Sequence, residues 1–318
     1  MSIECISISD PASGATARVL AGFGFNCFEF QIQHQGRPVD VLWAADQFER
    51  GDQRPSGSGI PLLFPFPGRI KGKTLRWDGR EFPLPGDDGR GNAIHGFVLN
   101  RPWRVIESAG NYVVGQFQAS IDDAQLLKHW PADFRITVRY ELEGTTLCSV
   151  LRIENPDDRP LPCGLGTHPY FRVPLGGSNS NDVEVRLPVS RRWDLVEMDP
   201  SGDCLAIDDA SGLQAGRSFA DIQFDAVFAG LKFDDDELCR ARVSDPESGI
   251  TLQLEFDKIF RECVVYTPPH REAICIEPYT CVPNAADLQA RGIDSGLRIL
   301  APGESFEAHV VMRCSYVS

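Results

Sequence analysis

Alternation of apolar and polar residues along short segments is the feature that most constrains the fold of this chain. Residues 249–256 (GITLQLEF) are the clearest case, with apolar side chains at Ile250, Leu252, Leu254 and Phe256. Successive side chains of a β-strand point to opposite faces, so this period of two predicts a strand with one buried face. Residues 133–142, 145–155 and 181–189 repeat the pattern, and turn pairs such as Glu143-Gly144 separate the segments. Antiparallel sheets are therefore predicted.

Helical signals are few. Residues 121–131 begin with acidic residues and end at Pro131, which predicts one short helix. The 29 glycines and 23 prolines are spread along all 318 residues without an obvious linker. We therefore predict one domain, 1–318, of the all-β class, built as a large antiparallel β-sandwich with few short helices. Residues 49–59 are the segment most typical of a flexible loop.

Charge and cysteine content limit the partners and the compartment. A net charge of −14 disfavours nucleic acid and anionic membrane surfaces as partners. No cationic stretch with a following apolar run opens the chain, and no run of about 18 apolar residues occurs, so we expect neither export nor a membrane span. The ten cysteines form no C-x-x-C pair and include Cys148 and Cys314 in strand-like runs. Reduced core cysteines and a cytoplasmic location are expected.

Known cofactor and nucleophile motifs are absent from the sequence. There is no phosphate-binding loop, no H-E-x-x-H helix and no G-x-S-x-G elbow, and the glycines of residues 22–27 do not complete a dinucleotide motif. Any chemistry should therefore use ordinary side chains.

Four segments combine polar or ionisable residues with Gly, Pro and aromatic residues where the chain must bend: 64–72, 91–103, 164–173 and 274–288. Loops at a sheet rim build sites in this way. His168 precedes Pro169, which favours extended backbone and places the histidine at a strand end. Glu277 ends a run of small and apolar residues, where burial would raise the pKa of its carboxyl group.

Each candidate also has a structural explanation when taken alone. His95 is compatible with a satisfied buried histidine, and Arg69 with a surface ion pair. Together, Glu277, His95 and His168 with Arg69 and Asp225 would form a general acid/base site for a polyhydroxylated ligand. A three-histidine or histidine/carboxylate metal site is the competing arrangement. No two candidates have a short ligand spacing such as H-x-H, so we predict no metal.

These segments resemble the aldose 1-epimerase (mutarotase) family of the galactose mutarotase-like superfamily. The resemblance lies in residues 60–103, in THPYFRV (167–173), in FDAVFAGL (224–231) and in IEPYTCVPNAADL (276–288), in matching order over about residues 40–312. It implies a large β-sandwich that holds a sugar in an open cleft and needs neither metal nor organic cofactor.

The resemblance also implies roles for single residues. Glu277 would remove the proton of the anomeric hydroxyl, and His168 would protonate the ring oxygen. The ring would then open, rotate about C1–C2 and close on the other face of the carbonyl. The substrate-binding residues would be His95, Arg69, Asp225 and Asn92.

Departures from the family pattern affect the expected substrate. Residues 95–103 (HGFVLNRPW) are closer to the branch of the family that contains hexose-6-phosphate epimerases. However, Leu99 occupies a position at which that branch usually has an arginine. We therefore expect a free aldose. A glucose-6-phosphate 1-epimerase would need two or more converging cations, for which the candidates are Arg69, Lys71, Arg101 and Arg172.

Two other classes remain open at this stage. One is a non-catalytic carbohydrate-binding or sensing domain on the same fold. The other is a polysaccharide lyase or hydrolase, which would need a long groove and, for hydrolysis, paired carboxylates. For the epimerase that we expect, the partner is a small-molecule sugar, and the protein could be a monomer or a homodimer.

Overall fold

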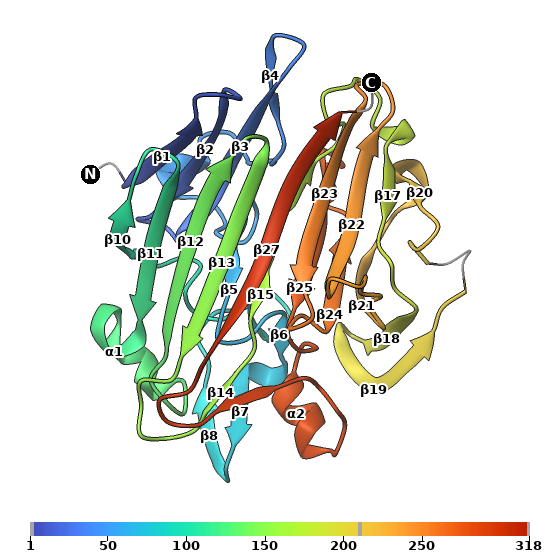
Figure 1. Ribbon diagram of the computed structural model, residues 1–318. Helices are drawn as coiled ribbons and strands as arrows, with labels where there is room; N and C mark the ends of the chain where they lie inside the picture. Colours follow the sequence, from blue (N-terminus) through green and yellow to red (C-terminus); the bar gives the residue numbers. More distant parts are fainter. Residues whose placement is uncertain (1–2, 209–211, 317–318) are drawn as a thin grey trace.

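The computed structural model describes residues 3–208 and 212–316, and most of these form antiparallel strands arranged in two layers (Figure 1). The first layer is a nine-stranded sheet whose long central strands lie side by side in the figure. In spatial order its strands are β10 (Arg104–Ser108), β11 (Tyr112–Gln118), β12 (Arg135–Glu143), β13 (Thr146–Glu154), β27 (Ser305–Tyr316), β23 (Ile250–Asp257), β22 (Leu238–Asp245), β17 (Glu184–Arg186) and β20 (Arg217–Ser218).

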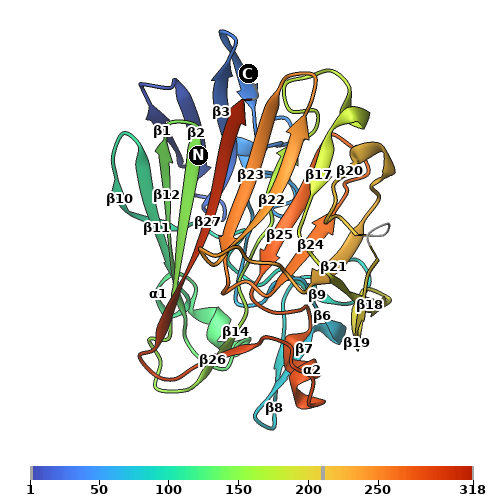
Figure 2. The ribbon, with the colours of Figure 1, turned by 45° about the vertical axis from the view of Figure 1, so that its right-hand side comes forward.

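An eight-stranded sheet forms most of the second layer (Figure 2). Its path is β19 (Asp199–Ala206), β18 (Arg191–Val196), β21 (Asp225–Ala229), β24 (Glu262–Tyr266), β25 (Ala273–Tyr279), β15 (Gly166–Thr167) and β5 (Leu62–Leu63), with β16 (Tyr170–Arg172) also paired to β25. The strand β25 is therefore the partner of β24, β15 and β16.

A four-stranded sheet extends the second layer. It contains β1 (Cys5–Asp10), β2 (Ala15–Leu20), β3 (Asn26–His34) and β4 (Arg37–Asp40). Single bridges from Cys27 to Ile60 and from Leu42 to Phe171 join it to the segments around the eight-stranded sheet. Its strand β1 packs against β11 and β12 of the first layer.

Short pairs and turns complete the described chain. The pairs are β6 (Arg69–Ile70) with β9 (Ala93–Ile94), β7 (Thr74–Trp77) with β8 (Arg80–Pro83), and β14 (Leu161–Cys163) with β26 (Arg298–Leu300). The helices are α1 (Ala119–Asp122) and α2 (Ala285–Ala290), and the 3-10 turns are η1 (Phe48–Arg50), η2 (Lys71–Lys73), η3 (Ala124–Lys128), η4 (Ser180–Asp182) and η5 (Phe219–Asp221). Within the described residues, no helix has the length and apolar character that a membrane span requires.

The apolar faces of the two layers meet in the main core, as the alternation predicts. On β23, Ile250, Leu252, Leu254 and Phe256 are all buried. Facing side chains of β12 and β3, among them Ile136, Val138 and Phe30, belong to the same buried cluster. Full burial of one such side chain stabilises the fold by about 1.5–3 kcal/mol. The predicted all-β class with antiparallel sheets and few short helices is confirmed.

Two local predictions need correction, and one short helix was not predicted. The helix predicted over 121–131 is broken at Asp123, whose extended backbone ends α1 while its carboxylate accepts from the Gln125 amide and starts η3. Helix α2 was not predicted, because its segment was interpreted only as part of a site. The predicted flexible loop 49–59 is buried at Ser56, Ser58 and Gly59, where Asn26 donates to the Ser58 carbonyl.

All ten cysteines are free, as expected, and seven of them are buried. Cys148 is half-buried rather than part of the core. The reason is strand alternation, because its neighbours Leu147 and Ser149 occupy the core-facing side of β13.

A close backbone contact fixes the loop that follows β9. Gly96 has a left-handed φ of 71° and forms an isolated bridge with Phe64. A Cβ atom added at Gly96 would lie 2.1 Å from the Phe64 carbonyl oxygen, a distance that requires the backbone to move. Gly91 also has a positive φ, 85°, but an added Cβ there would meet nothing within 4 Å.

We expect Gly96→Ala to lower the free energy of unfolding by at least about 3 kcal/mol, because it adds a backbone clash to the cost of a left-handed alanine. Gly91→Ala is the matched control and should cost about 1 kcal/mol, since only the left-handed term applies. Urea unfolding of both variants measures the difference. Equal losses would show that the contact with Phe64 does not constrain this loop.

Candidate active site

Strand β25 supplies the carboxyl group at the centre of the candidate site. All seven of its residues are buried, and alternation places Cys275, Glu277 and Tyr279 on one face. Ile274 and Ile276 point to the other face and join the main core. Glu277 therefore lies inside a strand rather than at its end, where the sequence had suggested it.

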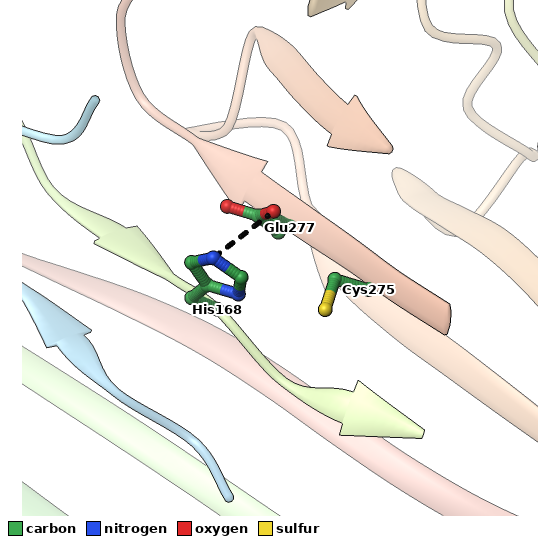
Figure 3. Close-up of side chains that lie close together, drawn as sticks. All are labelled: His168, Cys275 and Glu277. Atoms are coloured by element: carbon green, nitrogen blue, oxygen red, sulfur yellow. Dashed lines mark ion pairs between the residues drawn. The ribbon is translucent and has the colours of Figure 1, made fainter. Parts of the chain in front are cut away.

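His168 lies between β15 and β16, and both of these short strands pair with β25. Its backbone amide donates to the Pro61 carbonyl at 3.0 Å, and its ring stacks on Tyr170 with centroids 4.8 Å apart. These contacts bring its Nε2 atom to 3.4 Å from Oε1 of Glu277 (Figure 3). The second carboxylate oxygen, Oε2, accepts a hydrogen bond of 2.7 Å from the Tyr279 hydroxyl.

Burial determines how this pair holds protons. Glu277 is 1% exposed, and loss of water raises its pKa well above the usual 4.5, while the hydrogen bond from Tyr279 acts in the opposite direction. His168 is 5% exposed, and burial lowers its pKa from 6.5 to about 3. Burial thus favours the uncharged form of each group.

The pairing of β6 with β9 brings Arg69 and His95 to the same site. Arg69 is opposite Ile94 in this pair, and the His95 amide donates to the Gly68 carbonyl at 2.8 Å. The rings of His95 and His168 lie edge to face with centroids 5.5 Å apart. Burial lowers the pKa of His95 well below 6.5, and the positive charge of Arg69 adds to this effect.

Asp88 holds Arg69 in place and was not predicted. Its Oδ2 atom accepts from Arg69 Nε at 3.0 Å and from Asn92 Nδ2 at 3.1 Å. Burial alone would raise the pKa of Asp88, but hydrogen bonds from Asn92, Arg90 and Arg69 outweigh it and lower the pKa to about 2. Asn92 thus contacts Asp88 and the Gly72 amide, and it does not line the pocket that a substrate would fill. We therefore interpret it as a support for Asp88 rather than as a sugar ligand.

These side chains surround a pocket of about 270 Å³. Five of the six predicted site residues line it: Glu277, His168, His95, Arg69 and Asp225. Asp225 lies at the start of β21, and partial burial raises the pKa of its carboxyl group while Arg69 and Arg90 lower it. A second pocket of about 510 Å³ shares lining residues with the first, including Arg54 and His95.

Several lining residues were missed by sequence reasoning, chiefly Arg54, Arg90, Tyr266 and Tyr279. Tyr279 had a usable signal, because residues two apart on a strand share a face and Glu277 precedes it by two. Arg54 lies in the predicted flexible loop, where nothing in the sequence indicates which way a side chain points.

The four cations proposed as phosphate partners all have acidic partners. Arg69 pairs with Asp88, Lys71 with Asp199, Arg101 with Asp123 and Arg172 with Asp40, at 3.0, 3.3, 2.7 and 3.8 Å. In contrast, Arg54 and Arg90 line the pocket and have no ion-pair partner among residues 3–208 and 212–316. Arg54 Nε donates to the Ser56 hydroxyl at 3.0 Å.

The arrangement is able to move protons. A buried carboxyl and a buried imidazole share one proton at the wall of a polar pocket, where a bound hydroxyl group would find both a donor and an acceptor. Within the described residues, His168, Cys275 and Glu277 also form one group of possible metal ligands.

Comparison with known proteins shows the family and the fold of this chain. The sequence profile described as "Aldose 1-epimerase" matches residues 6–313. The chain belongs to the aldose 1-epimerase family. A small sugar as ligand follows from membership of this family. The Escherichia coli protein YphB, described as uncharacterized, is 24% identical over 307 residues, which cover 91% of this chain and 96% of YphB.

Solved structures show the same fold at low sequence identity. A galactose mutarotase-like protein from Clostridium acetobutylicum has a TM-score of 0.85 and 21% identity, with 99% of each chain covered. A putative aldose 1-epimerase from Escherichia coli has a TM-score of 0.79 and 19% identity, with 99% of this chain and 100% of that chain covered. Galactose 1-epimerase from Lactobacillus acidophilus has a TM-score of 0.74 and 16% identity over the whole of both chains.

A second buried glutamate lies on the neighbouring strand of this aldose 1-epimerase family member. Glu262 is opposite Tyr279 in the pairing of β24 with β25, and its Oε2 atom accepts from Trp193 Nε1 at 2.9 Å. Burial raises its pKa from 4.5 to about 7, while the Trp193 hydrogen bond opposes the shift. Glu262 does not line the pocket, so we interpret it as a structural carboxyl group.

The raised pKa of Glu262 makes stability depend on pH. Between about pH 4.5 and 7 the folded protein holds a proton that the unfolded chain releases, so this group's contribution falls as the pH rises. The free energy of unfolding that Glu262 contributes falls by about 1.4 kcal/mol for each pH unit, and by at most about 3 kcal/mol in total.

Glu262→Gln removes this titration. We expect the stability of the variant relative to wild type to increase by up to about 3 kcal/mol from pH 4.5 to pH 8. Urea unfolding at both pH values measures the two free energies. A constant difference between the proteins would mean that Glu262 ionises normally in the folded state.

Proposed function

We propose that the protein is an aldose 1-epimerase that interconverts the α and β anomers of a free aldose by acid/base ring opening and closure. The observation that carries the proposal is the contact of 3.4 Å between His168 and Glu277 in the wall of a pocket for a small polar ligand. The family and fold support the same class of reaction.

In the proposed reaction, Glu277 accepts the proton of the anomeric hydroxyl while His168 donates a proton to the ring oxygen. The C1–C2 bond of the open-chain aldehyde then rotates, and the same two groups reverse their roles as the ring closes. His95 hydrogen-bonds near the anomeric centre, and Arg69 and Asp225 bind the sugar hydroxyls. Proton transfer of this kind contributes about 10²–10⁴-fold to a rate.

Sugar binding itself prepares the pair for this reaction. In the free pocket burial keeps the proton off the histidine, because neither charged form is solvated. An anomeric hydroxyl that donates to Glu277 favours the carboxylate, and this shifts the shared proton to His168. The acid and the base are thus formed together, next to the atoms on which they act.

The ion pairs in and around the pocket support an unphosphorylated substrate. Arg69, which lines the pocket, is neutralised by Asp88, and Asp225 adds a further acidic group. These two carboxylates act against phosphate binding, since they offset two of the three arginines that line the pocket, Arg54, Arg69 and Arg90. The same residues are well suited to form hydrogen bonds with the hydroxyl groups of a sugar.

One observation favours a second candidate, a glucose-6-phosphate 1-epimerase. Arg54 lies at the junction of the two pockets, and neither Arg54 nor Arg90 forms an ion pair within the described parts of the chain. A glucose-6-phosphate 1-epimerase would need at least two cations in its pocket, and Arg54 and Arg90 provide two. They are not the residues that the sequence analysis proposed for this role.

Polarimetry of freshly dissolved α-D-glucose and α-D-galactose tests the catalytic role of Glu277. We expect the wild-type protein to speed the approach to equilibrium and Glu277→Gln to reduce kcat at least about 100-fold, because the amide cannot accept the proton. Glu262→Gln, a buried glutamate on the adjacent strand, is the matched control and should keep the wild-type rate. Sugar binding without any acceleration by the wild type would instead support a non-catalytic binding domain.

Comparison of substrates separates the two enzyme candidates. We expect a higher kcat/KM for glucose or galactose than for glucose 6-phosphate, measured with an assay specific for one anomer. Arg54→Gln should then change the free-sugar rate less than threefold. A preference for the phosphate ester, lost about 10-fold or more in Arg54→Gln, would establish the second candidate, since an ionic hydrogen bond is worth about 1.5–3 kcal/mol.

A further inference from the structure

Three potential metal ligands of different chemistry lie close together, and two of them line the sugar pocket. A ring nitrogen of His168, the sulfur of Cys275 and a carboxylate oxygen of Glu277 all lie within 4.8 Å of one another. Figure 3 shows the three side chains close together. All three residues are buried. The sequence separates His168 from the other two by more than 100 positions, so ligand spacing in the sequence could not reveal the group.

We propose that His168, Cys275 and Glu277 form a binding site for a divalent cation of the zinc class, and that occupation of this site blocks the sugar pocket. The inference concerns metal binding and does not rest on the proposed epimerase activity.

The distances fit such an ion with small movements. In a tetrahedral zinc site the bonds of about 2.0–2.3 Å place neighbouring ligand atoms about 3.3–3.6 Å apart. The Nε2 atom of His168 and the Oε1 atom of Glu277 are already 3.4 Å apart. The sulfur atom, at up to 4.8 Å, has to approach by about 1 Å.

The chemistry of the three ligand atoms indicates which class of metal ion the site would bind. Nitrogen, sulfur and oxygen donors together suit zinc and its neighbours among the transition metals, whereas Mg²⁺ and Ca²⁺ prefer oxygen ligands alone. A thiolate and a carboxylate would balance the two positive charges of the ion. Arg54 and Arg69 are the nearby cations that oppose it, while Asp88 neutralises Arg69 and Asp225 adds negative charge.

The only approach that the described residues show is through the pocket. His168 and Glu277 line it, whereas Cys275 lies fully buried behind them. An ion in this position would take the nitrogen and oxygen atoms that a sugar hydroxyl needs. Metal and sugar should therefore compete.

Titration with Co²⁺ of the full-length protein, freed of metal with a chelator, tests the site directly. We expect one Co²⁺ per chain and a near-ultraviolet charge-transfer band from a cobalt–thiolate bond. Cys275→Ser should lose the band, whereas Cys281→Ser, a buried cysteine outside the group, should keep it. A band that persists in Cys275→Ser would overturn the proposal.

Calorimetric titration with Zn²⁺ provides a second measurement with a different ligand removed. Glu277→Gln should bind Zn²⁺ at least about 10-fold more weakly than wild type, given that even supporting residues of metal sites cost 10–100-fold. Glu262→Gln should bind as wild type does. Unchanged affinity in Glu277→Gln, with a wild-type circular dichroism spectrum, would contradict the assignment of ligands.

Discussion

The structure around the pocket depends on a carboxyl group and an imidazole held in contact away from water. Burying either group in its charged form would cost several kcal/mol, whereas a pair that shares one proton avoids most of that cost. The surroundings provide what this requires: a hydroxyl on one carboxylate oxygen, the imidazole by the other and an aromatic ring stacked on the imidazole. The site and the stability of this sheet are therefore linked.

Most of the fold was predictable, because alternation in single segments already determines which face of each strand is buried. Residues 249–256 gave a correct strand and a correct buried face. The errors arose where one side chain overrides a local pattern. Asp123 divides the expected helix by capping a 3-10 turn. Cys148, in contrast, follows the alternation of β13, and the error was to expect it in the core.

The candidate site was predictable in part, for a similar reason. Resemblance to a family identifies positions in motifs, and five of the six positions do line one pocket. It does not reveal partners that come from loops, such as Arg54 and Asp88. Nor does it reveal that Asn92 supports Asp88, since the use of its amide group depends on a turn that only the folded chain defines.

The alternation of β25 has a consequence for assembly of the molecule. Cys275, Glu277 and Tyr279 share one face, and Ile274 and Ile276 share the other. A shift of one residue in the pairing of this strand would place the glutamate in the apolar core and two isoleucines in the pocket. Such a chain would lose both its chemistry and its stability at once. Misassembled molecules would therefore unfold readily, and the molecules that survive quality control in the cell would be those with a complete site.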